Sequence, residues 1–428
     1  MIFHKTLKNI RKKHGFTQEE FAKKLGCTVE QIVAIESNVK PATYIFVTLL
    51  RDKLKLHNAP ITESERSTLM NGLYNWKLAI DYADISTAKM LQPELEKSVR
   101  ASYSPSAENF YDLYAADYYR AIGDMKAYEE TMATLSQRTD EFSARHLYYY
   151  QRLVGARAFV EKRYQEAIKA YKKAEALDKN NEWHDVRFYF GMGMSLSDRG
   201  YATRAIAYLE KAKHQAMWNK VYNGRRNSRF DVYIDGYLAS DLAKIGKIDD
   251  ALKILDKRLE IEMGKNSEQG MGYTYFSFGR VYYRVKNYDK AIINYDKALL
   301  CLDVDSDAYI ASLFQKAMSL DASNKKVEAS KIAKKGLSIT TDELWKTLFD
   351  ALAHSTSLYD DPKSSIYLKE TLIPKLLDHG QYEVAMYYYK QLSDFYYEEG
   401  NSDVALKYSN HAVDINELIR KDLIEGDM

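Results

Sequence analysis

The chain has 428 residues, of which 46% are hydrophobic and 29% charged, proportions that are ordinary for a soluble globular protein. It contains no stretch of 18 apolar residues and no apolar leader, which excludes a membrane-spanning helix and a secretory signal of the usual kind. The net charge of +2 is uneven: residues 1–60 hold 11 Lys and Arg against 5 Asp and Glu, a charge of +6, so the remainder carries −4. A basic N-terminal segment of this kind suggests contact with phosphates.

The cysteine and proline contents indicate the redox compartment and the type of secondary structure. Cys27 and Cys301 are far apart and show no metal-ligand spacing, which indicates a reducing compartment, so we expect a cytoplasmic protein without membrane contact. The 6 prolines are few for this length and favour long helices, because proline breaks them. A chain of this length usually forms two or more domains or one repeat array.

The N-terminal segment contains the pattern of a helix-turn-helix unit. Gly15 ends a basic first helix, and Thr17-Gln-Glu-Glu then forms a capping box, in which Glu20 can bond back to the Thr17 amide. Gly26 provides the next turn, and Thr28-Val-Glu-Gln opens a second capping box for the third helix.

A fourth helix follows Pro41, which separates it from the third. We expect its apolar side to contain Ile45, Leu49 and Leu50, which recur at helical spacing. The segment His57 to Ser64 has no helical stripe and is predicted to be a linker.

Residues 1–60 resemble the Xre/lambda-repressor-like helix-turn-helix family, chiefly in the run Thr-Gln-Glu-Glu-Phe-Ala-Lys-Lys-Leu-Gly and in Ile35-Glu36 before Pro41. The resemblance implies that the second helix anchors to phosphate and that the third enters the major groove. DNA contacts are then expected from Thr17, Gln18, Thr28, Val29, Glu30, Val33, Ser37 and Lys40. The exposed face of the third helix is apolar and acidic rather than rich in Arg, Asn and Gln, so weak DNA binding or a dimerisation role is the alternative interpretation.

The remaining residues contain repeated helical pairs of the tetratricopeptide type, each about 34 residues long. In the clearest pair, Gly279 and Ala291 allow two helices to approach closely, and tyrosines fill the space around that contact. The corresponding anchors are spaced 38 to 46 residues apart, at Ala167, Ala205, Ala251, Ala291 and Ala329. A further pair lies near the C-terminus, and pairs without the full signature are expected at 65–98, 105–138 and 343–379.

Roughly nine pairs are expected in total. The predicted fold is therefore all-α, with an N-terminal helix-turn-helix domain over residues 1–60 and a right-handed tetratricopeptide-repeat superhelix over 61–428. The first domain is expected to bind DNA, and the second to bind a peptide and to form oligomers.

Ligand contacts are expected from first-helix positions that face the concave channel of the repeats, outside the packing consensus. Asn and Gln side chains can bond the main chain of an extended peptide, and Arg can pair with its carboxylate. The candidate peptide-binding residues are Arg152, Arg187, Asn227, Tyr233, Tyr273, Arg280, Phe314 and Gln315.

The sequence lacks the motifs of an enzyme. Gly191-Met-Gly193 is missing the third glycine of a phosphate loop, and the 9 histidines show no zinc pattern. No nucleophile elbow or catalytic-cysteine signature is present. We therefore expect no catalytic residues, no metal site and no cofactor.

The head and repeats together resemble the quorum-sensing receptors of Gram-positive bacteria, the Rap/NprR/PlcR/PrgX group, and are most similar to NprR. The resemblance implies a transcription regulator that acts as a homodimer or higher oligomer on a palindromic operator and is switched by a short re-imported signalling peptide. Three alternatives remain open, one of which is a tetratricopeptide scaffold with a vestigial head. A Rap-like body could bind a response regulator and inhibit or dephosphorylate it, and phage arbitrium receptors share the same plan.

Overall fold

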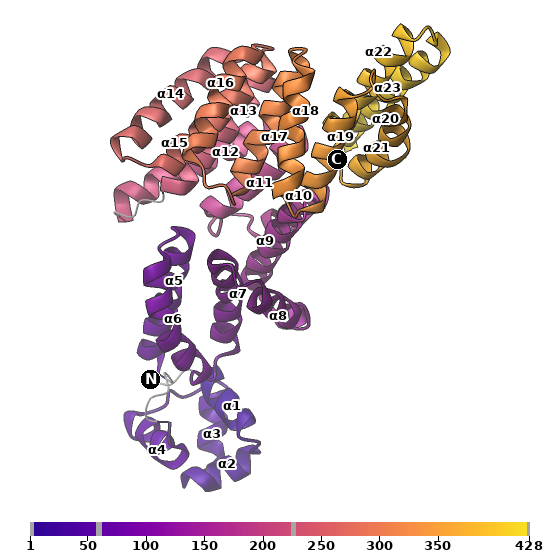
Figure 1. The fold of residues 1–428 in the computed structure, drawn as a ribbon. Helices are drawn as coiled ribbons and strands as arrows, with labels where there is room; N and C mark the ends of the chain where they lie inside the picture. The colour runs from indigo at the N-terminus through magenta and orange to yellow at the C-terminus, as the bar shows by residue number, and fades with distance from the viewer. Residues whose placement is uncertain (1–3, 57–61, 224–227, 426–428) are drawn as a thin grey trace. The chain divides into compact units, whose positions relative to one another are not determined.

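The computed structural model is all-α and describes residues 4–56, 62–223 and 228–425. It confirms the predicted order of a helix-turn-helix head followed by repeat helices (Figure 1). The chain divides into two compact units: an N-terminal unit of Met1–Val154 and Lys172–His184, and a C-terminal unit of Gly155–Tyr171 and Asp185–Met428. Within the described ranges no helix has the length and apolar character needed to cross a membrane.

The head has four short helices, as predicted. They are α1 (His4–Lys13), α2 (Gln18–Leu25), α3 (Val29–Glu36) and α4 (Tyr44–Leu54). Both capping boxes form: the Thr17 hydroxyl accepts from the Glu20 amide at 3.2 Å, and the Thr28 hydroxyl accepts from the Gln31 amide at 3.3 Å. Gly26 ends α2 at a φ of 73°, a left-handed conformation that favours glycine.

The core of the head differs from the prediction at the fourth helix. Leu50 is fully buried as expected, but Ile45 is 79% exposed, and Phe46 and Val47 occupy the core instead. The reason is the register of α4: Thr43 caps the helix, and the first turn points Ile45 toward solvent. The expectation that Ile45 is buried is therefore wrong.

The N-terminal unit continues with helical pairs. They are α5 (Glu63–Asp81) with α6 (Ile85–Arg100), and α7 (Pro105–Ile122) with α8 (Met125–Ser136), at the positions predicted for 65–98 and 105–138. Trp76 lies at their centre, where its ring stacks on Tyr111 at a centroid distance of 5.0 Å and its indole N–H donates to the Ala88 carbonyl. Most of the predicted linker, residues 57–61, lies outside the described residues.

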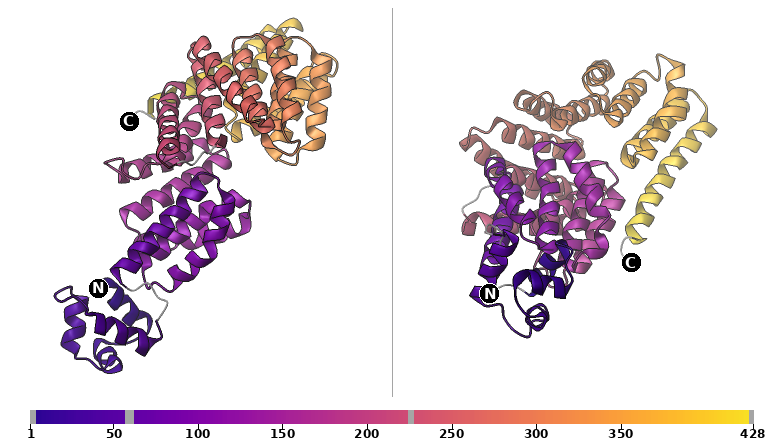
Figure 2. Two further views of the ribbon diagram at one scale, coloured as in Figure 1. Left: turned by 90° about the vertical axis from the view of Figure 1, so that its left-hand side faces the viewer. Right: turned by 90° about the horizontal axis from the view of Figure 1, so that it is seen from below.

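The repeat array runs on in both units through further antiparallel pairs. The next helices are α9 (Ala144–Val160), α10 (Tyr164–Leu177), α11 (Val186–Asp198), α12 (Ala202–Asn223), α13 (Ser228–Lys244), α14 (Ile248–Gly264), α15 (Glu268–Arg284) and α16 (Tyr288–Cys301). The last are α17 (Asp307–Ala322), α18 (Lys326–Ile339), α19 (Glu343–Thr356), α20 (Pro362–Tyr367), α21 (Ile373–Asp378), α22 (Tyr382–Glu398) and α23 (Ser402–Glu425). A π-helical turn, Leu368–Leu372, joins α20 to α21. From α5 on, contacts within a pair are present for eight pairs of the described helices, and each helix from α11 to α18 contacts the next along the chain (Figure 1). Figure 2 shows the same helices from two further sides.

The predicted anchors of the repeats are all buried. Each of the five anchor alanines is 0% exposed: Ala167, Ala205, Ala251, Ala291 and Ala329. Gly279 of α15 faces the ring of Tyr295 on α16 so closely that an added Cβ would overlap with it, and Tyr295 is itself 0% exposed. Small side chains therefore set the distance between paired helices, as the sequence predicts.

This contact gives a first testable prediction. Gly279→Ala should lower the free energy of unfolding by roughly 1–2 kcal/mol, because forcing a buried ring to move costs more than alanine gains as a helix former. The control is Gly264→Ala at the end of α14, where an added Cβ meets no atom within 4 Å and stability should stay or rise. Chemical denaturation of the two variants checks this, and equal midpoints would contradict the close approach at Gly279.

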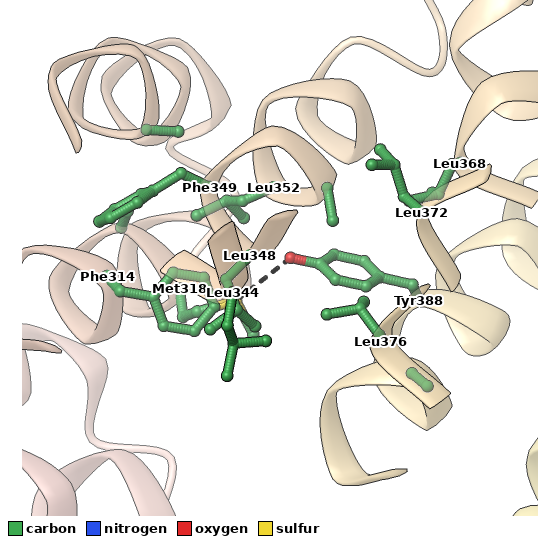
Figure 3. Packing of buried hydrophobic residues seen from close by; sticks show 14 of the residues in the cluster. Phe314, Met318, Leu344, Leu348, Phe349, Leu352, Leu368, Leu372, Leu376 and Tyr388 are labelled. Carbon is green, nitrogen blue, oxygen red and sulfur yellow. Dashed lines mark hydrogen bonds between the residues drawn. The ribbon is translucent and has the colours of Figure 1, made fainter. Parts of the chain in front are cut away.

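A hydrophobic cluster joins the later repeats of the C-terminal unit. Phe314 and Met318 of α17 pack against leucines of α19, and Tyr388 of α22 points at Met318 from the other side (Figure 3). The Tyr388 hydroxyl lies 3.9 Å from the Met318 sulfur. The cluster thus fixes α22 relative to α17, although 70 residues separate Tyr388 from Met318 along the chain.

Candidate functional site

The predicted recognition face lies on α3 and on the turn after it. Glu30, Ser37 and Lys40 are exposed, and Val33 is 41% exposed, so these side chains are open to a ligand. Val29 is only half-exposed, because it packs partly against the head core. The Ser37 hydroxyl donates to the Val33 carbonyl at 2.6 Å, so its hydrogen is already bonded to the backbone one turn earlier. The face is apolar and acidic, as its sequence indicates.

An ion-pair network holds α1, α2 and α3 together. Arg11 donates to both carboxylate oxygens of Glu36, at 2.7 and 2.9 Å, and the Gln18 amide donates to Glu36 at 2.9 Å. Burial alone would raise the pKa of Glu36, but the bonds from Arg11 and Gln18 outweigh this and hold that pKa below its usual value of 4.5. The Gln18 amide group, predicted to anchor DNA, is therefore bound to Glu36, and the hydroxyls of Thr17 and Thr28 cap helices.

The exposed lysines of the head supply the positive charge that the α3 face lacks. Lys23 and Lys24 stand exposed at the end of α2, and Lys53 and Lys55 at the end of α4. Lysines in such positions can pair with phosphates without reading the base sequence. The DNA contacts expected from the family resemblance do not include these four lysines. The positive charge of residues 1–60 is the sequence signal that indicates them.

The head is tied to the helical pairs of its own unit through Tyr103, in the turn between α6 and α7. Asn9 donates to the Tyr103 carbonyl at 3.1 Å, and a His14 ring nitrogen lies 3.2 Å from the Tyr103 hydroxyl. The Lys13 ammonium lies 5.1 Å from the centre of the same ring and 3.6 Å from Glu108. A movement of α6 and α7 would therefore be passed to α1.

A cavity of about 490 Å³ opens inside the C-terminal unit. Its walls come from α13, α15 and α17 on one side and from α22 and α23 on the other. It is lined by Ser240, Lys244, Arg280, Tyr283, Arg284, Phe314, Gln315, Met318, Glu383, Val384, Met386, Tyr387, Lys390 and Asn416. The cavity brings together three of the residues predicted to bind peptide, namely Arg280, Phe314 and Gln315.

The α22 wall of this cavity is held by a partly buried hydrogen bond. The Tyr387 hydroxyl donates to Asp321 of α17 at 2.6 Å. Burial raises the pKa of Asp321, an effect that the bond from Tyr387 only partly offsets. Sequence reasoning did not find the α22 residues of the wall, because no local pattern shows which distant helix closes the channel.

The other predicted peptide contacts lie elsewhere. Arg152, in the N-terminal unit, is 2% exposed and forms an ion pair with Asp117, so the expectation that it faces an open channel is not met. Tyr233 and Tyr273 meet edge to face at a centroid distance of 4.7 Å, and Arg187 lies 5.7 Å from the Phe230 ring centre. These three belong to α13, α15 and α11 and do not line the cavity. Asn227 lies outside the described residues.

A second cavity, of about 650 Å³, lies between α12, α13 and α14. Arg258 crosses its floor and donates to Asp235 at 2.6 and 2.8 Å, and Lys213 pairs with the same carboxylate at 2.7 Å. Arg258 and Lys213 are therefore paired with a carboxylate, whereas Lys253 and Lys257, which also line this cavity, are exposed.

The described residues show one arrangement that resembles a hydrolase site. A ring nitrogen of His354 lies 3.0 Å from the Ser364 hydroxyl, and the other lies 3.6 Å from Asp350. Ser364 is only 1% exposed, so a substrate cannot reach its hydroxyl, and the group is better explained as a structural hydrogen-bond chain. No cluster of three or more His, Cys, Asp or Glu that could hold a metal ion occurs in the part of the chain that the structure describes.

Comparisons with known proteins agree with this architecture. Residues 7–56 match the helix-turn-helix family, and residues 273–300 match the tetratricopeptide repeat family. The transcriptional activator NprA of Geobacillus stearothermophilus is 20% identical over 398 residues, which cover 89% of this chain and 95% of NprA. A solved Rap protein in complex with competence and sporulation factor covers 83% of this chain and 99% of its own, at 15% identity and a TM-score of 0.73.

A further solved structure, NprR in complex with its cognate peptide NprX, covers 82% of this chain and 98% of its own, at 16% identity and a TM-score of 0.66. Fold and domain order therefore define this chain as a helix-turn-helix protein with a tetratricopeptide-repeat body. Within that class its fold and domain order are similar to those of NprA, NprR and Rap proteins.

Proposed function

We propose that this protein is a transcription regulator whose head, residues 1–60, binds DNA and whose repeats, residues 61–428, bind a short signalling peptide. The observation that carries the proposal is the cavity in which Arg280, Phe314 and Gln315 meet, in a chain that also has a helix-turn-helix head. Support comes from two relatives, because NprA is named a transcriptional activator and NprR was solved with a cognate peptide.

The walls of the cavity suggest how a peptide would act. A ligand that touches α15 and α22 together favours whichever spacing of these helices gives it the better contacts. A single head offers few phosphate contacts, so operator binding requires a dimer with two correctly spaced heads. We propose that peptide binding changes the dimer contacts of the repeats and thereby the spacing of the heads.

The peptide half of this proposal is tested by native mass spectrometry. The full-length protein is mixed with the small-peptide fraction of the host's spent medium, beside Arg280→Ala/Gln315→Ala and the control Lys331→Ala, an exposed cation on α18. We expect an adduct of roughly five to ten residues on wild type and control, and a much weaker one on the double variant. An equal adduct on all three would place the peptide elsewhere, and no adduct on any of them would refute a peptide receptor.

The DNA half predicts a specific effect of Lys40, which is exposed just after α3. Lys40→Ala should weaken duplex DNA binding at every sequence and reduce the slope of log affinity against log salt by about one, because one phosphate contact is lost. Fluorescence anisotropy between low and physiological salt measures the slope, with Lys331→Ala as control. An unchanged slope would remove Lys40 from the DNA contact.

One observation favours a second function. The exposed α3 face carries Glu30 and Val33 and no arginine, which is a poor surface for reading bases. A Rap-like activity toward a response regulator would not need that face. Selection of genomic fragments on the full-length protein distinguishes the two, because enrichment of one palindromic sequence supports the regulator. Absence of any enrichment, with retention of a phosphorylated response regulator, would support the second function.

A further inference from the structure

Three cations that line the 490 Å³ cavity form no direct ion pair among the described residues. Arg280 and Arg284 reach the cavity from α15 and Lys390 from α22. Lys244, which also lines the cavity, is different, because its ammonium pairs with Asp241 at 2.9 Å and donates to the Ser197 carbonyl at 2.8 Å. The charge available to a ligand therefore comes from Arg280, Arg284 and Lys390.

Aromatic rings position the Arg280 guanidinium. Its central carbon lies 5.8 Å from the Tyr237 ring centre and 5.9 Å from that of Phe276, so two rings flank the group, and the Asp198 carboxylate interacts with it only from beyond ion-pair distance. A guanidinium held in this way keeps its N–H donors, which match a carboxylate in a two-bond geometry. Charged groups of like sign gathered around one cavity repel each other, and a bound anion relieves that repulsion.

Part of the remaining cavity wall is apolar. Phe314 is 3% exposed, and Met318, Val384 and Met386 add aliphatic and thioether surface. The volume of about 490 Å³ is typical of a small-molecule site. An extended peptide of seven residues spans about 23–25 Å, so the cavity takes one end of it rather than the whole.

Building on the proposed function, we infer that the ligand enters this cavity with a carboxylate next to an apolar side chain, and that the carboxylate bridges the arginines of α15 and Lys390 of α22. The carboxylate belongs either to the free C-terminus of the peptide or to an Asp or Glu close to one end. Both sources present the same chemistry to the same three cations.

Glu383 provides a test of whether the ligand group in the cavity is negatively or positively charged. It is the single acidic residue among those that line the cavity, and it lies on α22 two turns before Lys390. Its charge opposes a carboxylate ligand, so Glu383→Gln should tighten binding. A cationic ligand would respond in the opposite way.

The experiment is affinity selection on the full-length protein with three random heptapeptide libraries. The first has a free C-terminus, the second is amidated, and the third has a free C-terminus but no Asp or Glu. If the C-terminal carboxylate binds, we expect more peptide to be retained from the first library than from the second. If an Asp or Glu side chain binds, we expect more to be retained from the first library than from the third. Equal retention from all three would overturn the carboxylate inference and leave peptide binding intact, whereas no retention from any library would overturn both.

Variants then assign the site, with a retained peptide as the probe. Arg280→Gln and Arg284→Gln should each weaken its binding by about 10- to 100-fold, since each removes a charge-assisted hydrogen bond. Lys390→Gln, on an exposed side chain, should weaken it without disturbing the fold, Glu383→Gln should strengthen it, and Lys331→Gln should leave it unchanged. Unchanged affinity in Lys390→Gln together with weaker binding in Glu383→Gln would refute the arrangement.

Discussion

Arg152→Ala should destabilise the N-terminal unit by roughly 3–5 kcal/mol. Arg152 and Asp117 are 2% and 3% exposed, and removal of one partner leaves the other charge buried. Arg120, which lies 3.1 Å from Asp117, compensates only in part because it remains 28% exposed. Hydrogen exchange of α7 and α9 in the full-length protein measures the loss directly.

A matched control separates this structural role from ligand binding. Arg152→Met/Asp117→Asn removes both charges and should recover most of the stability, because a neutral pair carries no desolvated charge. Under conditions where Arg152→Ala remains folded, peptide binding in the cavity of the C-terminal unit should be unchanged. Lost peptide binding with normal hydrogen exchange would instead make Arg152 a ligand contact, as its sequence position suggested.

Glu36→Ala should destabilise the head by roughly 3 kcal/mol. The substitution leaves Arg11, which is only 11% exposed, without its partner, and it removes the bonds that link α1 and α2 to α3. Duplex DNA affinity should fall with the population of folded head. Hydrogen exchange of α1 to α3 measures the effect, with Glu19→Ala, an exposed residue of α2, as the control that should show none.

The effect of Glu36 should depend on pH in a defined direction. The pKa of Glu36 is lowered in the folded head, so its carboxylate stabilises the fold above the unfolded value of 4.5. That stabilisation is lost as the pH falls through the lower, folded pKa. The difference in the free energy of unfolding of the head between wild type and Glu36→Gln should therefore be largest at pH 6–7 and shrink below pH 4.5. A difference that grows in acid would contradict the ion-pair network.

Local structure was largely predictable from the sequence. Capping boxes and anchor alanines depend on residues a few positions apart, so Thr17, Thr28 and Ala291 could be assigned without a structure. The placement of Ile45 failed because helical spacing alone does not fix the first residue of a helix, and a shift of one position turns a side chain by about 100°.

The candidate site was only half predictable. Arg280, Phe314 and Gln315 were found because they occupy first-helix positions outside the packing consensus. Arg152 occupies a comparable position but meets Asp117, a partner 35 residues away, and no periodicity indicates that contact. Lys390 and Tyr387 lie about a hundred residues beyond Arg280, and only the packing of α22 against α17 brings them to the cavity.

That packing has a consequence for how the protein is made. A ribosome delivers the chain from its N-terminus, and domains fold as they emerge. The head and α13 to α17 are complete long before Tyr382, where α22 begins. A nascent chain, or one cut short by a premature stop codon near residue 380, would therefore carry a folded head but only one wall of the ligand cavity. On the function proposed above, such a product would keep the DNA-contacting head without a complete ligand site, so truncation after about residue 380 should give an unresponsive rather than an inactive protein.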